Sequence, residues 1–162
     1  MDNTNHPAAG ADFARGRIIT PGTEHQLGTY GLFPPSSMQH RTLMTAGGPL
    51  AAKNAEPDLL WTSFAELCAG TVPEADYHAL AGQHAAWVID GVPAPDTDQS
   101  PQKSAAWERF GTLVGILYER DITLFLIGTR LPPDMARIAP PLSFLEYVES
   151  AGDIIVEEIS GS

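Results

Sequence analysis

Apolar residues recur along the chain with two different periods, and each period defines predicted elements. Residues 85–90 (Ala-Ala-Trp-Val-Ile-Asp) and 122–128 (Ile-Thr-Leu-Phe-Leu-Ile-Gly) are nearly continuous apolar runs of strand length. Such runs are typical of strands covered on both faces. Between them, residues 104–119 have apolar side chains three and four positions apart, which predicts a helix with one apolar face. That face comprises Trp107, Phe110, Leu113, Val114, Leu117 and Tyr118. The sequence therefore predicts an α/β fold with a right-handed βαβ unit over residues 85–128.

Shorter elements are predicted on either side of this unit. Residues 41–45 and 49–52 form a β-hairpin around Gly47-Gly48, and residues 59–62 form a further strand. Ser63 caps a brief helix, and a second helix runs from about Val72 to Gly82. After the βαβ unit, one helical turn is expected from Asp134. A short helix is expected over residues 144–150, with a last strand over 154–156.

The first 40 residues show no sustained apolar period. Prolines and glycines are interleaved there, so residues 1–40 are interpreted as a flexible or peripheral lead-in with a short strand near residues 17–20. The remaining 41–162 are expected to form the α/β domain. A chain of 162 residues has room for one such domain with a single hydrophobic core.

Charge and cysteine content limit the classes of partner. The formal net charge is −11, from 9 basic and 20 acidic residues. A surface this negative repels phosphate backbones, so nucleic-acid binding is not expected. The single Cys68 cannot form an internal disulfide, which indicates a reducing, cytoplasmic environment, and it is expected to be a buried, inert thiol. No apolar run reaches the length of about 20 residues that a membrane span needs, and the N-terminus has no signal-peptide pattern.

One constellation has candidate chemistry. Because both strands of the βαβ unit run in the same direction, Asp90 and the turn containing Thr129 and Arg130 are expected at the same edge of the sheet. An apolar strand that ends in Asp is similar to a Walker B strand, although Gly91 stands where a catalytic Walker B has a second acid. Asp90 therefore has two interpretations, a catalytic carboxylate or a strand-end residue that binds loop amides. Thr129 either binds nucleotide or makes turn hydrogen bonds, and Arg130 either contacts phosphate or pairs with a surface acid.

Other chemistries are excluded by spacing. Residues 96–107 begin like a calcium loop, but Pro101 occupies the position that requires Gly, and Trp107 the position that requires Glu. His78 and His84 are six residues apart and share no helical face, so no metal site is predicted. The sequence contains neither a Gly-x-Ser-x-Gly elbow nor the phosphate-binding motif Gly-x-x-x-x-Gly-Lys-[Ser/Thr].

A series of short segments between His40 and Pro133 has a distinctive order and spacing. These segments are Arg41–Leu43, Trp61–Cys68, Ala75–Ala81, Trp87–Pro93, Arg109–Phe110, Leu113–Val114, Leu117–Tyr118 and Leu124–Gly128. Together they resemble the C-terminal half of the ZapE-like (AFG-type) P-loop ATPases of the AAA class, which are associated with cell division. The chain departs from the family at Gly115, where an acid is usual. It also departs after Pro133, where an acidic segment replaces an Arg-rich helix.

The resemblance implies a partial P-loop-NTPase-like sheet and, for the complete family, hydrolysis of ATP with Mg²⁺. It also implies protein partners in division or protein quality control. The leading hypothesis is the C-terminal portion, or a truncated form, of such an ATPase, which binds no cofactor by itself. A stand-alone protein-interaction module without nucleotide chemistry is the alternative. A small enzyme that uses Asp90 as an acid or base is a third class.

Overall fold

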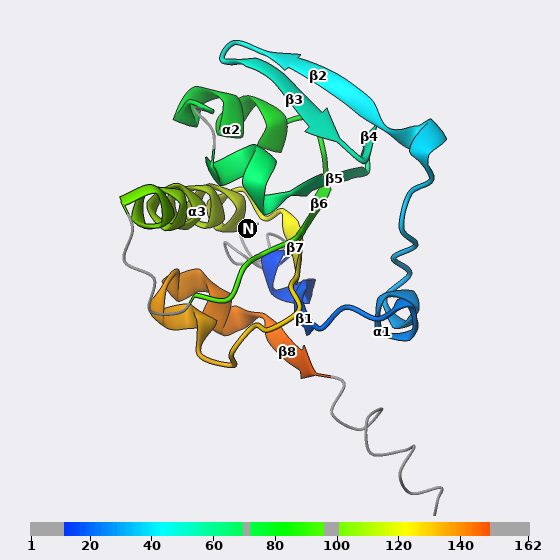
Figure 1. Ribbon diagram of the computed structural model, residues 1–162, viewed down its shortest axis with the longest axis vertical. Coiled ribbons are helices and arrows are strands. Elements are labelled where there is room, and N and C mark those ends of the chain that lie inside the picture. Colours follow the sequence, from blue (N-terminus) through cyan, green and yellow to red (C-terminus); the bar gives the residue numbers. More distant parts are fainter. Residues whose placement is uncertain (1–11, 70–71, 96–100, 150–162) are drawn as a thin grey trace, which may run out of the picture.

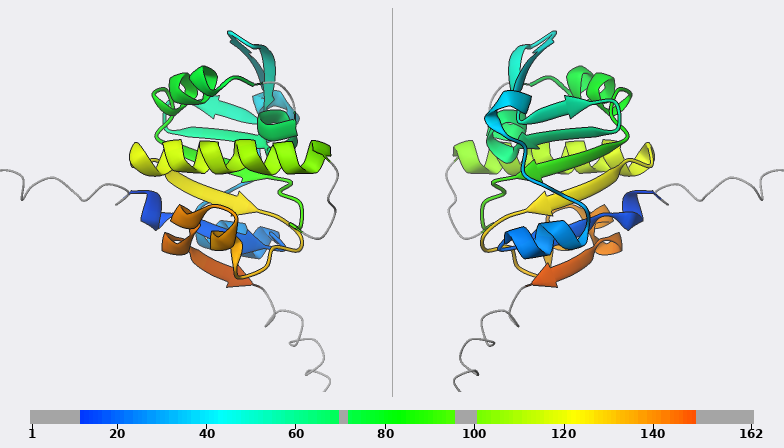
Figure 2. Two further views of the ribbon diagram at one scale, coloured as in Figure 1. Left: turned by 90° about the vertical axis from the view of Figure 1, so that its left-hand side faces the viewer. Right: turned by 90° about the vertical axis from the view of Figure 1, so that its right-hand side faces the viewer.

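The molecule is built on a mixed six-stranded sheet with a projecting β-hairpin (Figures 1 and 2). The computed structural model describes residues 12–69, 72–95 and 101–149. The strands are β1 Arg17–Thr20, β2 Arg41–Thr45, β3 Gly48–Ala52, β4 Asn54–Glu56, β5 Leu59–Ser63, β6 Ala86–Asp90, β7 Thr123–Ile127 and β8 Glu146–Glu149. The helices are α1 Glu24–Thr29, α2 Glu74–Ala81 and α3 Pro101–Glu119, with a π-helical turn at Ala65–Ala69 and shorter 3-10 turns.

The predicted βαβ unit is confirmed. The strand order in the large sheet is β4-β5-β6-β7-β1-β8, so β6 and β7 are direct neighbours. They are parallel, with Trp87 opposite Leu124 and Ile89 opposite Leu126. Among the described strands of this large sheet, only β4 runs antiparallel to its neighbour. The fold is therefore mixed α/β, as the apolar pattern indicated.

Two hydrophobic clusters cover the two faces of the sheet. Helices α2 and α3 pack on one face, whereas the shorter α1 packs on the other (Figures 1 and 2). The predicted apolar side of α3 meets the first face, and Phe110, Leu113, Val114 and Leu117 are all completely buried there. Helix α3 packs against this face because its apolar residues recur with the helical period and form one continuous stripe.

The N-terminal region differs from the expected peripheral lead-in. Strand β1 lies inside the sheet, parallel to β7 on one side and to β8 on the other. Phe13 and Ile19 have no exposed surface, and α1 is part of the second apolar cluster. The short strand expected near residues 17–20 is confirmed as β1. Its place inside the sheet was not predicted, because a four-residue strand flanked by Gly and Pro has too few positions to show a period. Residues 1–11 lie outside the described residues.

The predicted hairpin is confirmed, whereas the helix predicted in the C-terminal segment is not. Strands β2 and β3 form the predicted antiparallel hairpin, but its turn is Ala46-Gly47, one residue before the predicted Gly47-Gly48, because Gly48 pairs with Thr45 in the ladder. The expected helix over 144–150 is wrong, because a 3-10 turn at Pro140–Phe144 is followed by strand β8. Parallel pairing with β1 decides this, since it satisfies backbone groups that a helix this short would leave unpaired. The strand expected over 154–156 lies outside the described residues.

Replacing Gly115 by alanine is expected to raise the free energy of unfolding by about 0.5–1 kcal/mol. A Cβ at this position in α3 would meet no atom within 4 Å, so alanine would reduce the backbone entropy of the unfolded chain without a steric cost. Urea denaturation followed by circular dichroism measures the change. A less stable variant would contradict the open surroundings of Gly115.

Candidate functional site

The parallel strands end at one edge of the sheet, where ligands bind in open α/β folds. The connection that follows β1 carries α1 over one face of the sheet, whereas the connection that follows β7 packs against α3 on the opposite face. The two neighbouring strands β1 and β7 thus form a topological switch point. Thr129 and Arg130 follow β7 at this point, and both are exposed.

The amides at the switch point are already bonded within the chain. Thr23 caps α1, and the side-chain oxygen of Gln26 accepts hydrogen bonds from the N–H groups of Gly22 and Thr23 at 2.8 and 2.9 Å. The hydroxyl of Thr23 in turn accepts from the N–H of Gln26 at 3.1 Å. In nucleotide-binding folds, amides in this place bind phosphate. In this chain the capping box satisfies the amides of Gly22, Thr23 and Gln26 instead.

The loop after β6 closes part of the same edge. The N–H of Val92 donates to the carbonyl oxygen of Ile127 at 3.1 Å. A Cβ on Gly128 would lie 2.4 Å from the carbonyl oxygen of Val92, so only glycine permits this approach. This crossing loop leaves less of the edge open to a ligand.

Asp90 forms a charged cluster on the other side of β6. Its Oδ2 atom accepts from the Lys53 ammonium group at 2.6 Å and from the Trp61 indole N–H at 2.9 Å. The Asp90 side chain is only 16% exposed, so the carboxylate is largely shielded from water. Asp90 is thus hydrogen-bonded at the end of its strand, but its partners are two side chains rather than the loop amides of the second interpretation.

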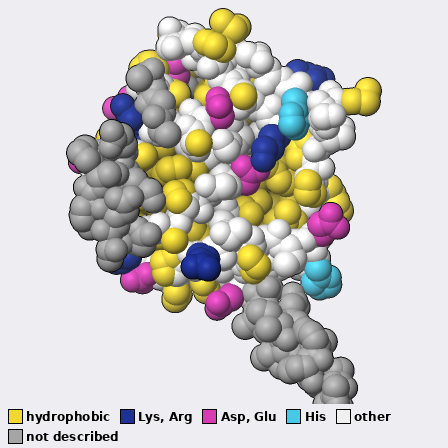
Figure 3. Space-filling model, in the orientation of Figure 1, with side chains coloured by type: hydrophobic (Ala, Val, Ile, Leu, Met, Phe, Trp, Pro, Cys, Tyr) yellow, Lys and Arg dark blue, Asp and Glu magenta, His cyan; other side chains and the backbone are white. Residues whose placement is uncertain are grey.

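The structure therefore brings together the strands but not the side chains of the sequence-predicted site. Asp90 turns toward β5, and the loop through Val92 crosses the end of the neighbouring β7. In the described part of the chain, Arg130 has no ion pair with an acid, and Thr129 makes no turn hydrogen bond. Figure 3 views the molecule from the side at which the parallel strands end. The basic side chains visible there are scattered rather than clustered.

Sequence reasoning missed the partners of Asp90 and the role of Gln26. Lys53 lies between β3 and β4, 37 residues before Asp90, and no local pattern links the two residues. Gln26 could have been found, because Thr23 and Gln26 have the spacing of a capping box.

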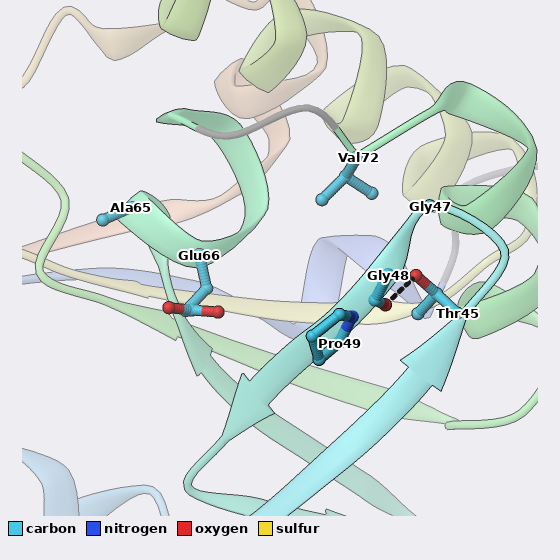
Figure 4. A pocket seen from close by; sticks show the side chains of 7 residues that line it. All are labelled: Thr45, Gly47, Gly48, Pro49, Ala65, Glu66 and Val72. Carbon is cyan, nitrogen blue, oxygen red and sulfur yellow. Dashed lines mark hydrogen bonds between the residues drawn. The ribbon is translucent and has the colours of Figure 1, made fainter.

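A cavity of about 240 Å³ lies between the β2–β3 turn and the π-helical turn that follows β5 (Figure 4). It is lined by Thr45, Gly47, Gly48, Pro49, Ala65, Glu66 and Val72. Glu66 is engaged, because its carboxylate accepts from the N–H of Ala51 at 2.9 Å. This volume is below the range of about 300–1,000 Å³ that is typical of ligand sites.

Cys68 is buried and unreactive by its surroundings, as expected. It has no exposed surface, and burial raises the pKa of its thiol to about 12. The nearby hydroxyl of Tyr77 donates to the carbonyl oxygen of Leu67 at 2.6 Å, and burial also raises the pKa of this phenol. A thiol with so high a pKa has almost no thiolate at neutral pH, which is the form that acts as a nucleophile.

The described residues contain neither a metal-binding cluster nor a membrane-spanning helix. Within residues 12–69, 72–95 and 101–149, no three His, Cys, Asp or Glu side chains come together in a way that could hold a metal ion. None of the helices in these ranges has the length and apolar character needed to cross a bilayer.

The fold and the edge of the sheet define a class of protein: a mixed α/β protein with a partial P-loop-NTPase-like sheet, whose βαβ unit is preceded along the chain by a β-hairpin. The family model described as AFG1-like ATPase matches residues 23–137, which is most of the chain. The chain belongs to this family. No curated protein and no solved structure matches the chain.

Proposed function

We propose that this chain is the C-terminal portion, or a truncated form, of a ZapE-like ATPase of the AAA class. In this proposal, binding of ATP and Mg²⁺ requires a phosphate-binding loop that this sequence does not contain. The observation that carries the proposal is the family match over residues 23–137 in a sequence without the phosphate-binding motif. Without that motif, no Lys reaches the β- and γ-phosphates and no hydroxyl holds Mg²⁺.

The surroundings of the candidate residues support the same conclusion. The Oδ2 atom of Asp90 already accepts from Lys53 and Trp61, so this carboxylate is engaged within the chain, whereas a Walker B carboxylate serves the bound Mg²⁺. The amides at the start of α1 bind Thr23 and Gln26 rather than a free anion. This part of the molecule therefore acts, in our proposal, as the scaffold of an ATPase rather than as its catalytic centre.

The cellular role is proposed from the family resemblance and the charge. We propose a cytoplasmic protein with partners in cell division or protein quality control, and no role in nucleic-acid binding. The net charge of −11 supports the last point, because it repels a phosphate backbone. Deleting the gene and measuring cell length by microscopy tests the division role, and cells of unchanged length would contradict it.

Titration of the purified chain with fluorescently labelled ATP and Mg²⁺ tests the nucleotide proposal directly. We expect no saturable binding and no release of phosphate. Arg130→Ala is the informative control, because the exposed Arg130 is the candidate phosphate contact. Saturable micromolar binding that this variant abolishes would overturn the proposal.

Asp90→Ala separates a structural role from a catalytic one. Under the scaffold proposal it lowers the free energy of unfolding by about 1–2 kcal/mol, because Trp61 loses a charge-assisted hydrogen bond and Lys53 loses its ion pair. Thermal denaturation measures this loss. An unchanged melting temperature, together with the loss of an ATPase activity that the unaltered chain possesses, would instead assign Asp90 to catalysis.

A further inference from the structure

The connection between α1 and β2 is exposed and is ordered mainly by its own hydrogen bonds. It runs along the outside of the molecule (Figures 1 and 2). None of the residues 33–42 is buried, and the side chains of Phe33 and Met38 are 71% and 85% exposed. In the part of the chain that the structure describes, residues 33–40 form hydrogen bonds only with one another and with Arg41. The connection thus presents two large apolar side chains that contribute little burial to this fold.

Two adjacent prolines favour a polyproline II backbone in this connection. The rings of Pro34 and Pro35 fix φ near about −65°, and each proline also favours an extended residue before it. Ser36, which follows, has φ −77° and ψ 166°, close to the polyproline II values of about −75° and about +145°. A polyproline II helix has no internal hydrogen bonds, so its backbone groups are open to a partner.

Both ends of this short polyproline II segment are fixed. Before it, Leu32 is buried in the second apolar cluster, and its N–H donates to the carbonyl oxygen of Leu27 at 2.9 Å. After it, the N–H of Ser36 donates to the side-chain oxygen of Gln39 at 2.9 Å, and the N–H of Gln39 donates to the carbonyl oxygen of Ser36 at 2.9 Å. The segment is therefore pre-organised without being covered, which lowers the entropy cost of binding it to a partner.

The chain around this segment contains no acidic residue, although the protein as a whole is strongly acidic. None of the 20 acidic residues lies between His25 and Ala55, whereas the net charge is −11. Arg41 is exposed, and its side chain donates only through Nη1, to the carbonyl oxygens of Met38 and His40 at 3.1 and 2.9 Å, among the described residues. Its other N–H groups are therefore available to a carboxylate of a partner.

We propose that residues 33–36 are a docking site for a partner protein domain that has an aromatic-lined groove for polyproline II ligands. In such grooves, aromatic side chains pack against a preformed polyproline II helix that loses little entropy on binding. Phe33 supplies an exposed apolar anchor beside the prolines, and Arg41 fits an acidic residue at the rim of the groove.

The Pro34-Pro35 pair favours this kind of partner over two others. Proline has no N–H to donate, so these residues cannot complete the ladder of a strand that a partner adds. A proline pair also disfavours the helical conformation that a helix-binding groove requires. The proposal concerns a surface away from the nucleotide question and does not depend on the proposed function.

Titration of the complete chain into isotopically labelled EVH1, WW and SH3 domains tests the proposal by NMR. These domains are the probes, because each has an aromatic-lined groove that takes proline-rich ligands. We expect at least one domain to show saturable shifts of its groove resonances at chain concentrations below about 1 mM. Unchanged groove resonances in all three domains would overturn the proposal.

Substitution of the prolines isolates the polyproline II segment. The double variant Pro34→Ala, Pro35→Ala removes both rings and their restriction on φ, so binding should weaken at least about tenfold. Pro49→Ala is the matched control and should bind like the unaltered chain, because Pro49 is also exposed but lies in β3. Circular dichroism checks that both variants are folded. If the folded double variant binds as tightly as Pro49→Ala, the proposal is wrong.

Two further variants test the side chains beside the prolines. Phe33→Ala should weaken binding at least about tenfold, because it removes the apolar anchor. Phe144→Ala is its control, since Phe144 is 55% exposed in another connection. Arg41→Gln should weaken binding by up to about fivefold and reduce its dependence on salt. Equal affinities of Phe33→Ala and Phe144→Ala would contradict the anchor, and an unchanged salt dependence in Arg41→Gln would contradict the charged contact.

Discussion

Replacing Gly16 by alanine is expected to lower the free energy of unfolding by about 3–5 kcal/mol, which is a large part of the stability of a typical domain. An added Cβ would lie 1.8 Å from the carbonyl oxygen of Leu124 and 2.7 Å from its carbonyl carbon. The backbone at Gly16, with φ −71° and ψ 179°, is ordinary for any residue, so the cost is steric alone. Urea denaturation followed by tryptophan fluorescence measures the loss.

The clash at Gly16 cannot relax easily, because the obstructing atoms belong to the backbone of Leu124 in the central strand β7. Moving it would disturb the pairing of β7 with β6 and β1 at once. Gly28→Ala in α1 is the matched control, since a Cβ there meets no atom closer than 4.0 Å. If both variants were as stable as the unaltered chain, the segment before β1 would not pack as described.

Raising the pH from about 8 to about 10.5 is expected to lower the free energy of unfolding by about 2 kcal/mol through Cys68. Burial raises the pKa of this thiol from its ordinary 9.0 to about 12, and the Tyr77 hydroxyl and the Arg109 charge oppose the shift only in part. Below pH 9 the thiol is protonated in both the folded and the unfolded chain, so its contribution to stability is unchanged. Above pH 9 only the unfolded chain loses the proton, and stability falls until the pH approaches 12.

Cys68→Ala is the control for this pH dependence. The variant lacks the thiol, so its stability should fall less steeply between the same two pH values, even if its stability at pH 8 is lower. Urea denaturation of both proteins at each pH gives the comparison. Equal slopes would show that Cys68 does not titrate differently in the two states. Tyr77 contributes in the same direction, because burial raises the pKa of its phenol as well.

The βαβ unit and the hairpin could be predicted because each depends on a pattern within a short stretch of chain. The apolar stripe of α3 and the continuous apolar runs of β6 and β7 specify burial without reference to any partner. By contrast, β1 has four residues and β8 has the mixed sequence Glu-Tyr-Val-Glu. A short strand was expected near residues 17–20, but the place of β1 in the sheet and the strand conformation of β8 depend on pairing that no local pattern records.

The candidate site was only partly predictable for the same reason. Strand direction placed Asp90 and Thr129 at one edge of the sheet, and the parallel neighbours β6 and β7 confirm that part. The direction in which the Asp90 carboxylate points depends on Lys53 and Trp61, which lie 37 and 29 residues away along the chain. The loop through Val92 further separates the ends of the two strands.

The sequence by itself determined the mixed α/β class, the apolar face of α3, the hairpin turn and the absence of a phosphate-binding motif, because each of these is a property of neighbouring residues. Only the tertiary structure decided that β1 lies inside the sheet between β7 and β8, that Asp90 is an ion-paired residue, and that Gln26 satisfies the amides at the switch point. These features arise from contacts between segments distant along the chain, or from the space that packing leaves for a side chain. Their free energy is gained only when the whole sheet has formed.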